Sequence, residues 1–339
     1  MTTLNQIRGM LLEECLLVLL RAGGYVPVLT AGKDPTLCDG KSGLECRGRG
    51  GVHQLDAVAD HRIRLPFINP QRLLLEAKCY QHDKVGLDVV RNAVGVLKDV
   101  SEWWVPAKRP GEMRSRFHYT YAIASGTGFS IAAQRYAFAQ DVYLLALKGV
   151  RCFAGVLQPI RELSAASFGA TDPLRVPIDL GALRRTVRGL LASRQPYTRP
   201  EIAPGTGPAL ARIVAATRRV GGAMIGVAPG GFSVILVPVH ARVIDQLGAR
   251  TPVRIMWDDQ GWWLENSDGQ RLFDFDLPEH LFRMYQRSGV LEEEAALDLK
   301  QRELSGFVAA RVRHGVPEVV HLELDAEWLE QLRRERRSR

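Results

Sequence analysis

The sequence predicts an α/β core with a mixed central sheet flanked by helices, followed by a β-rich, α+β C-terminal domain. Three observations support this division. Helical and strand-like apolar patterns alternate over residues 1–157, which is typical of a layered α/β domain. Residues 158–209 are interrupted by prolines and glycines, which indicates a linker with helical segments. Residues 210–339 carry short strand patterns separated by turn sequences.

The elements of the first domain follow from the spacing of its apolar residues. A helix is expected over 5–22, because this apolar run ends at Gly23-Gly24. Residues 31–51, rich in glycine and charge, are expected to form a loop. The remaining elements are expected to be strands at 25–29, 51–60, 72–80, 114–124 and 142–147, and helices at 85–100 and 130–139.

The later elements are shorter and turn-rich. One basic amphipathic helix is expected near 180–193, within the linker. The C-terminal domain is expected to contain strands at 222–228, 232–237, 253–257, 262–266 and 270–275, a helix at 278–287, and a hairpin of 307–313 with 319–324.

The composition describes an ordinary globular protein with a basic surface. Of 339 residues, 46% are apolar and 24% are charged, and the formal net charge is +8. A positive balance favours a polyanionic partner such as DNA. Five cysteines without metal-ligand spacing, no apolar run that could cross a bilayer and no secretory leader lead us to expect a reduced, cytoplasmic protein without a membrane partner.

Two neighbouring predicted strands carry the chemistry. Asp56 lies on the first strand, while Glu76 and Lys78 lie on the second, separated by one small residue. Because side chains on a strand alternate between faces, Glu76 and Lys78 should point the same way. A solvated ion pair on an edge strand is the alternative, but the apolar run before Glu76 argues against it. Carboxylates on adjacent strands can hold Mg²⁺, and a nearby lysine can act on water or phosphate.

The first helix can add another acid to this set. Glu13 and Glu14 interrupt an apolar run, and Glu13 shares a face with three leucines, so it is expected to point inward. A surface position on an amphipathic helix is the competing interpretation. Gln54 is expected to share a face with Asp56 and to reach a phosphate or a metal-bound water. Arg47 and Arg49 lie just before Asp56, where they serve either to grip DNA or to keep a loop soluble.

Five segments in order carry a family resemblance. They are Leu12-Glu13, the glycine-rich stretch 48–56 ending at Asp56, 75–80 with Glu76 and Lys78, 84–97, and 128–137. Together they resemble the Mrr-type restriction endonuclease family of the PD-(D/E)xK nuclease superfamily. The resemblance implies a restriction-endonuclease-like core. The C-terminal domain is not the family's usual winged-helix reader, and it is assigned to target recognition, dimerisation or partner binding.

The resemblance also implies an activity. It is Mg²⁺-dependent hydrolysis of DNA phosphodiester bonds, with Mn²⁺ as a substitute, in restriction or antiphage defence. Asp56 and Glu76 would be the metal ligands, Lys78 would lie beside the water, and Glu13 would support them. Since one site cuts one strand, double-strand cleavage implies a homodimer or paired complexes on DNA. Two alternatives stay open: a resolvase of Holliday junction-like branched DNA, and a nuclease or DNA-binding subunit that depends on a partner ATPase, as in a multi-protein defence system. No nucleotide-binding glycine loop is present in the chain.

Overall fold

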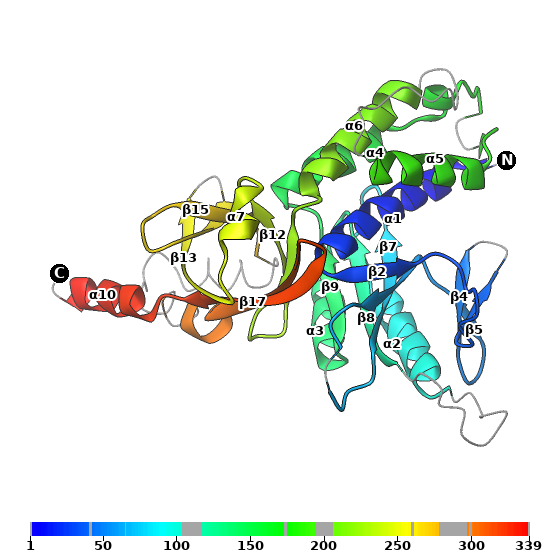
Figure 1. The fold of residues 1–339 in the computed structure, drawn as a ribbon. Helices are drawn as coiled ribbons and strands as arrows, with labels where there is room; N and C mark the ends of the chain where they lie inside the picture. Colours follow the sequence, from blue (N-terminus) through cyan, green and yellow to red (C-terminus); the bar gives the residue numbers. More distant parts are fainter. Residues whose placement is uncertain are drawn as a thin grey trace. The chain divides into compact units, whose positions relative to one another are not determined.

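A computed structural model describes residues 2–40, 43–64, 66–103, 117–172, 175–193, 206–258, 261–277, 297 and 300–337. The chain divides into two compact units (Figure 1). The first contains residues 1–21 and 25–221, and the second contains residues 22–24 and 222–339. Among the described helices, none is long and apolar enough to cross a membrane.

A mixed five-stranded sheet forms the centre of the first unit. Its order is β2-β6-β7-β8-β9. β2, β6 and β7 pair antiparallel, whereas β7, β8 and β9 pair parallel. The strands are β2 (Tyr25–Val28), β6 (Ala57–His61), β7 (Gln71–Lys78), β8 (His118–Ser125) and β9 (Val142–Ala146). The predicted mixed sheet is therefore confirmed, although residues 114–116 of the predicted fourth strand lie outside the described part of the chain.

Helices pack on this sheet as the apolar periodicity predicts. α1 (Leu4–Ala22) buries most of its apolar residues, and α2 (Leu87–Ser101) and α3 (Ile131–Ala139) lie beside β8 and β9 (Figure 1). Leu74 joins the core formed with α2 and α3, while Leu73 and Leu75 on the other face of β7 are also buried. Because both faces of β7 are covered, this strand reads as a continuous apolar run rather than an alternating one.

The region before β6 differs from its prediction. Residues 31–51 are not a plain loop, because they contain β3 (Leu37–Asp39) and β4 (Leu44–Arg47). The predicted strand 51–60 is two strands: β5 (Val52–Gln54) completes a small sheet with β3 and β4, and β6 belongs to the central sheet. Asp56 lies in the bend between them. The bend lets the chain change sheets, which a period-two pattern does not reveal.

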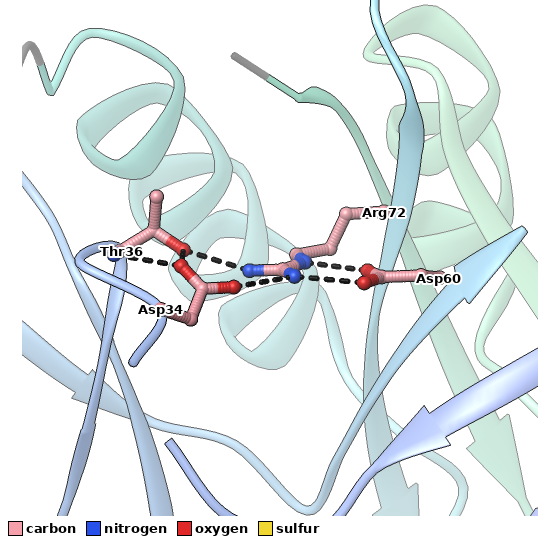
Figure 2. A network of polar contacts seen from close by, with 4 residues as sticks. All are labelled: Asp34, Thr36, Asp60 and Arg72. Carbon is pink, nitrogen blue, oxygen red and sulfur yellow. Dashed lines mark hydrogen bonds and ion pairs between the residues drawn. The ribbon is translucent and has the colours of Figure 1, made fainter. Parts of the chain in front are cut away.

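A buried arginine connects the segment that leads into this small sheet with the central sheet. Arg72, at the start of β7, donates from Nε and Nη2 to the two carboxylate oxygens of Asp60 at 2.6 and 2.9 Å (Figure 2). Its Nη2 also lies 2.7 Å from Asp34, and its Nη1 donates to the Thr36 hydroxyl at 2.7 Å. The guanidinium stacks on the Phe117 ring at 3.6 Å. A fork of donors in one plane suits this arrangement better than a lysine would.

Residues 158–221 belong to the first unit rather than standing apart from it. After α4 (Arg151–Glu162) and a 3₁₀ turn η1 (Ala165–Phe168), β10 (Arg175–Val176) pairs with β1 (Thr2–Thr3). α5 (Leu180–Ala192), predicted as a helix, is confirmed, and α6 (Thr206–Val220) packs on α4. The compact unit thus extends through Gly221, whereas the sequence suggested a linker ending at residue 209.

The second unit contains a closed barrel. The β-rich character of this domain is therefore confirmed, and its strands form one closed sheet. The strands run in the order β11-β12-β15-β14-β13-β17-β16. They are β11 (Met224–Val227), β12 (Ser233–Pro238), β13 (Arg250–Asp258), β14 (Gly261–Glu265), β15 (Arg271–Phe275), β16 (Gly306–Arg313) and β17 (Val316–Leu324). α7 (Arg242–Gln246) and α10 (Ala326–Arg337) accompany them. The helix expected at 278–287 lies outside the described residues.

Candidate functional site

Glu76 and Lys78 point the same way from the end of β7, as the strand alternation predicts. Lys78 Nζ lies 2.5 Å from Glu76 Oε1. Both side chains are largely shielded, with exposed fractions of 25% for Lys78 and 16% for Glu76. The solvated edge pair considered above therefore does not describe this arrangement, because β7 lies between β6 and β8 in the middle of the sheet.

The neighbouring strand supplies a second partner for Glu76. Tyr121 on β8 donates its hydroxyl to Glu76 Oε2 at 3.2 Å, and its side chain is buried. Burial first, and then the Glu76 charge, raise the pKa of Tyr121 above its usual range, so the phenol stays protonated as a donor. The sequence analysis missed this residue. Its signal was a tyrosine on a strand that pairs with the signature strand.

Lys78 remains an ammonium at neutral pH. Burial alone would lower the pKa of Lys78, but the hydrogen bond and charge of Glu76 raise it above its usual value, with Asp56 adding to the effect. The side chain is therefore a cation held beside two carboxylates. It can stabilise negative charge or orient water, and it is poorly suited to accept a proton at neutral pH.

Asp56 is fixed against β7 by the backbone. Its Oδ2 accepts a hydrogen bond from the amide N–H of Ala77 at 2.7 Å. Burial raises the pKa of Asp56, the Ala77 hydrogen bond opposes this change, and the Glu76 charge raises it further. Asp56 therefore lies close enough to Glu76 for the two charges to repel, which is the arrangement that the adjacent strands predicted.

Of the two acids on α1, Glu14 is the more deeply buried, so the burial order predicted from the leucine face is wrong. Glu14 is 1% exposed. Glu13 is nevertheless the acid that interacts electrostatically with Asp56. Burial, and then the charge of Asp56, raise the pKa of Glu13 to about 7. The surface alternative for Glu13 also fails, because its side chain is only 12% exposed. The two glutamates face different partners.

Those partners come from α5, which the sequence analysis did not connect with the site. Arg188 donates from Nε and Nη2 to both oxygens of Glu14 at 2.9 and 2.6 Å. Arg184 donates from Nη2 to Glu13 Oε2 at 2.7 Å, and its Nη1 lies 3.5 Å from Glu14 Oε1. Two arginines one helical turn apart were a visible signal in the sequence, but their partners lie about half the chain length away.

The three residues predicted to bind DNA lie outside this set of contacts. Gln54 is exposed on β5 in the small sheet, so it does not share a strand face with Asp56, and that prediction is wrong in its geometry. Arg47 is exposed at the end of β4. Arg49 is exposed and pairs with Glu102 at 2.9 Å. A DNA role for Arg47 and Arg49 stays a prediction.

The glycines before Asp56 have a structural explanation. Asp99 on α2 accepts from the Gly50 amide at 2.7 Å and contacts His53 Nε2 at 2.8 Å. A Cβ at Gly48 would collide with the Asp99 carboxylate. Glycine at position 48 therefore lets this loop pack over the end of α2 without displacing the Asp99 side chain.

The donor set fits a hard divalent cation. Among the described residues, no group of three or more Asp, Glu, His or Cys side chains is gathered as a preformed metal site. Mg²⁺, however, often binds through one or two carboxylates and keeps several waters. Asp56 and Glu76 can provide those two carboxylates. Burial is the main cause that raises the pKa values of Asp56 and Glu13, and the charges of neighbouring acids add to it, so a bound cation would favour the ionised carboxylates.

Comparisons with protein-family models, with curated proteins and with solved structures gave no match to this chain. The geometry of the described residues and the resemblance in the sequence are therefore the two indications of function.

Proposed function

We propose that the first unit is a restriction-endonuclease-like, Mg²⁺-dependent DNA endonuclease. The observation that carries the proposal is the set formed by Asp56, Glu76 and Lys78 at the end of β7. Asp56 is held by the Ala77 amide, and Lys78 is paired with Glu76 at 2.5 Å. Two acids and an ammonium, shielded at the end of β7 and in the bend before β6, are what metal-assisted phosphodiester hydrolysis requires. The basic net charge of +8 is consistent with a DNA substrate.

The residues of the chain divide the work in this proposal. Asp56 and Glu76 would hold Mg²⁺, which when bound polarises a phosphoryl oxygen and lowers the pKa of a water. Tyr121 orients Glu76 through its hydrogen bond. Lys78, an ammonium, stabilises the charge that develops on the phosphate. Glu13, whose pKa is raised to about 7, can accept or release a proton near neutral pH.

The biological setting follows as part of the same proposal. Defence against foreign DNA in the cytoplasm would suit an endonuclease of this type. Because the described part of each chain provides one such site, cutting both strands would need two copies of the chain on the DNA. A direct comparison of cleavage rates on linear duplex and on four-way junctions distinguishes a duplex endonuclease from a branched-DNA resolvase.

The test is plasmid cleavage with Mg²⁺ and with a chelator. Lys78→Ala and Asp56→Asn should each lower the cleavage rate by about 10²-fold or more. Lys98→Ala is the matched control, because Lys98 is an exposed lysine on α2 whose partner is Glu102. DNA binding by Lys78→Ala should remain near normal. Undiminished cleavage by Lys78→Ala, or in the chelator, would show that the proposal is wrong.

A further inference from the structure

The ion pairs between α1 and α5 are not equivalent. Glu14 and Arg188 make a two-pronged contact, and Glu14 is almost completely buried. This pair joins α5 to α1. Arg184 is attached differently, since its two contacts go to two different acids, at 2.7 Å to Glu13 and at 3.5 Å to Glu14. Its side chain keeps 27% exposure.

The charge of Arg184 reaches the candidate site itself. It lowers the pKa of Glu13 and that of Asp56, partly offsetting the effects of burial on both acids. Arg184 therefore belongs electrostatically to the cluster of Asp56 and Glu13, although α5 lies in a segment that the sequence marked as a linker. Glu13 and Glu14 together fix where its guanidinium lies.

A phosphate approaching this cluster meets an electrostatic problem. Glu13, Asp56 and Glu76 repel an anion, and Lys78, which would stabilise the charge on the phosphate, shares its own charge with Glu76 at 2.5 Å. A guanidinium has five N–H donors in a planar fork that matches a phosphate group. Arg184 uses two nitrogens on Glu13 and Glu14 and is still partly open to solvent.

We propose that Arg184 is a phosphate-binding residue of this site, presented by α5 and positioned by Glu13 and Glu14. The inference rests on the proposed function, and it adds a substrate contact from the segment between the sheet and the second unit. In the complex, Arg184 donates to a non-bridging phosphate oxygen of the DNA backbone while Arg188 keeps α5 in place. Such a contact is independent of base sequence.

The experiment measures the salt dependence of DNA binding in the Lys78→Ala background, where the DNA should stay intact. Each phosphate contact contributes about −0.9 to the slope of log K against log salt concentration. Adding Arg184→Gln should make the slope shallower by about 0.9 and weaken binding at low salt. Arg185→Gln is the matched control, because this substitution removes the same charge from an exposed position one residue further along α5. We expect a smaller change in slope for that control.

A merely structural role of Arg184 predicts a different result. Arg184→Gln would then lower the thermal unfolding temperature and leave the salt slope of DNA binding unchanged. An unchanged slope, or equal changes for Arg184→Gln and Arg185→Gln, overturns the inference. If Arg184→Gln does not fold, Glu13→Gln/Arg184→Gln removes both charges, with Glu13→Gln as its reference. Cleavage by the wild-type chain is recorded in parallel. If the wild type cuts DNA but Arg184→Gln leaves the salt slope of binding unchanged, this inference alone is refuted. A chain that neither cuts nor binds DNA refutes the proposed function as well.

Discussion

Glu13 and Arg184 lie 171 positions apart in the sequence, yet Arg184 Nη2 is 2.7 Å from Glu13 Oε2. This contact brings α5 to the acid cluster of the central sheet. It also means that Glu13, whose pKa is raised to about 7, is held by a helix that lies outside the central sheet. Variants of the site should therefore be interpreted with α5 in mind.

The stability of the chain should carry a pH-dependent contribution from Glu13. Folding raises the pKa of Glu13 from 4.5 to about 7, so the folded state holds this proton more tightly than the unfolded state. The contribution is fully present below the unfolded pKa and is lost as pH rises through about 7. Relative to Glu13→Gln, the wild type should lose up to about 3 kcal/mol over that range. Urea unfolding at several pH values measures the difference.

The control for this prediction is Glu330→Gln, because Glu330 is an exposed acid on α10 with 67% exposure. Its difference from the wild type measures the effect of removing a surface carboxylate, and it is subtracted from the difference found for Glu13→Gln. A constant difference between the wild type and Glu13→Gln would contradict the raised pKa.

Removal of the Tyr121 hydroxyl should disturb Glu76 without removing it. In Tyr121→Phe, Glu76 Oε2 loses a donor in a buried setting, so we expect a stability loss of about 1–3 kcal/mol. We also expect a higher Mg²⁺ concentration for half-maximal cleavage, because the carboxylate is less well oriented. Tyr119→Phe is the matched control on the same strand, since Tyr119 hydrogen-bonds Thr36 instead. An identical Mg²⁺ dependence in both variants would argue against a positioning role.

The Arg72 network should contribute strongly to stability. Burial alone would lower the pKa of Arg72, but Asp60 and Asp34 raise it, so the guanidinium is charged and satisfied in the core. Arg72→Met leaves two acids without their shared partner and should cost about 3–5 kcal/mol. Chemical denaturation measures this loss. Arg47→Met, at an exposed position on β4, should change stability by only about 0.5 kcal/mol. Equal stability of the two variants would refute the structural role.

Two thiols should be inert in the folded chain. Burial raises the pKa of Cys15 and of Cys46 to about 12, and both side chains are inaccessible. Alkylation of the native protein at neutral pH should spare both cysteines, and unfolding in urea should expose them. Mass spectrometry of the two samples provides the measurement. Rapid native labelling of either residue would place it at the surface instead.

The central elements were predictable because their patterns are local. The apolar helix 5–22 and the strand 72–80 each match an observed element to within two residues, as α1 and β7 show. The pairing of Glu76 with Lys78 followed from alternation alone. These features depend on the periodicity of a single segment, and periodicity is printed in the sequence.

The missed features depend on distant partners. The bend at Asp56 separates β5 from β6, and only the pairing of β5 with β4 explains it. The depth of Glu14 depends on Arg188, and the position of Arg184 depends on Glu13. A buried acid such as Glu14 on an apolar helix implies a cationic partner. The sequence contains many arginines, however, and it does not show which of them lies near Glu14.

Closure of the barrel in the second unit has a consequence for any molecule that binds there. Each of its seven strands pairs with a neighbour on both sides, so the barrel has no open edge. Along the paired residues, an incoming peptide therefore has no row of vacant main-chain donors and acceptors to extend. Recognition there would be achieved by side chains on the outer surface of the barrel and by its connecting loops, whether the ligand is nucleic acid or protein.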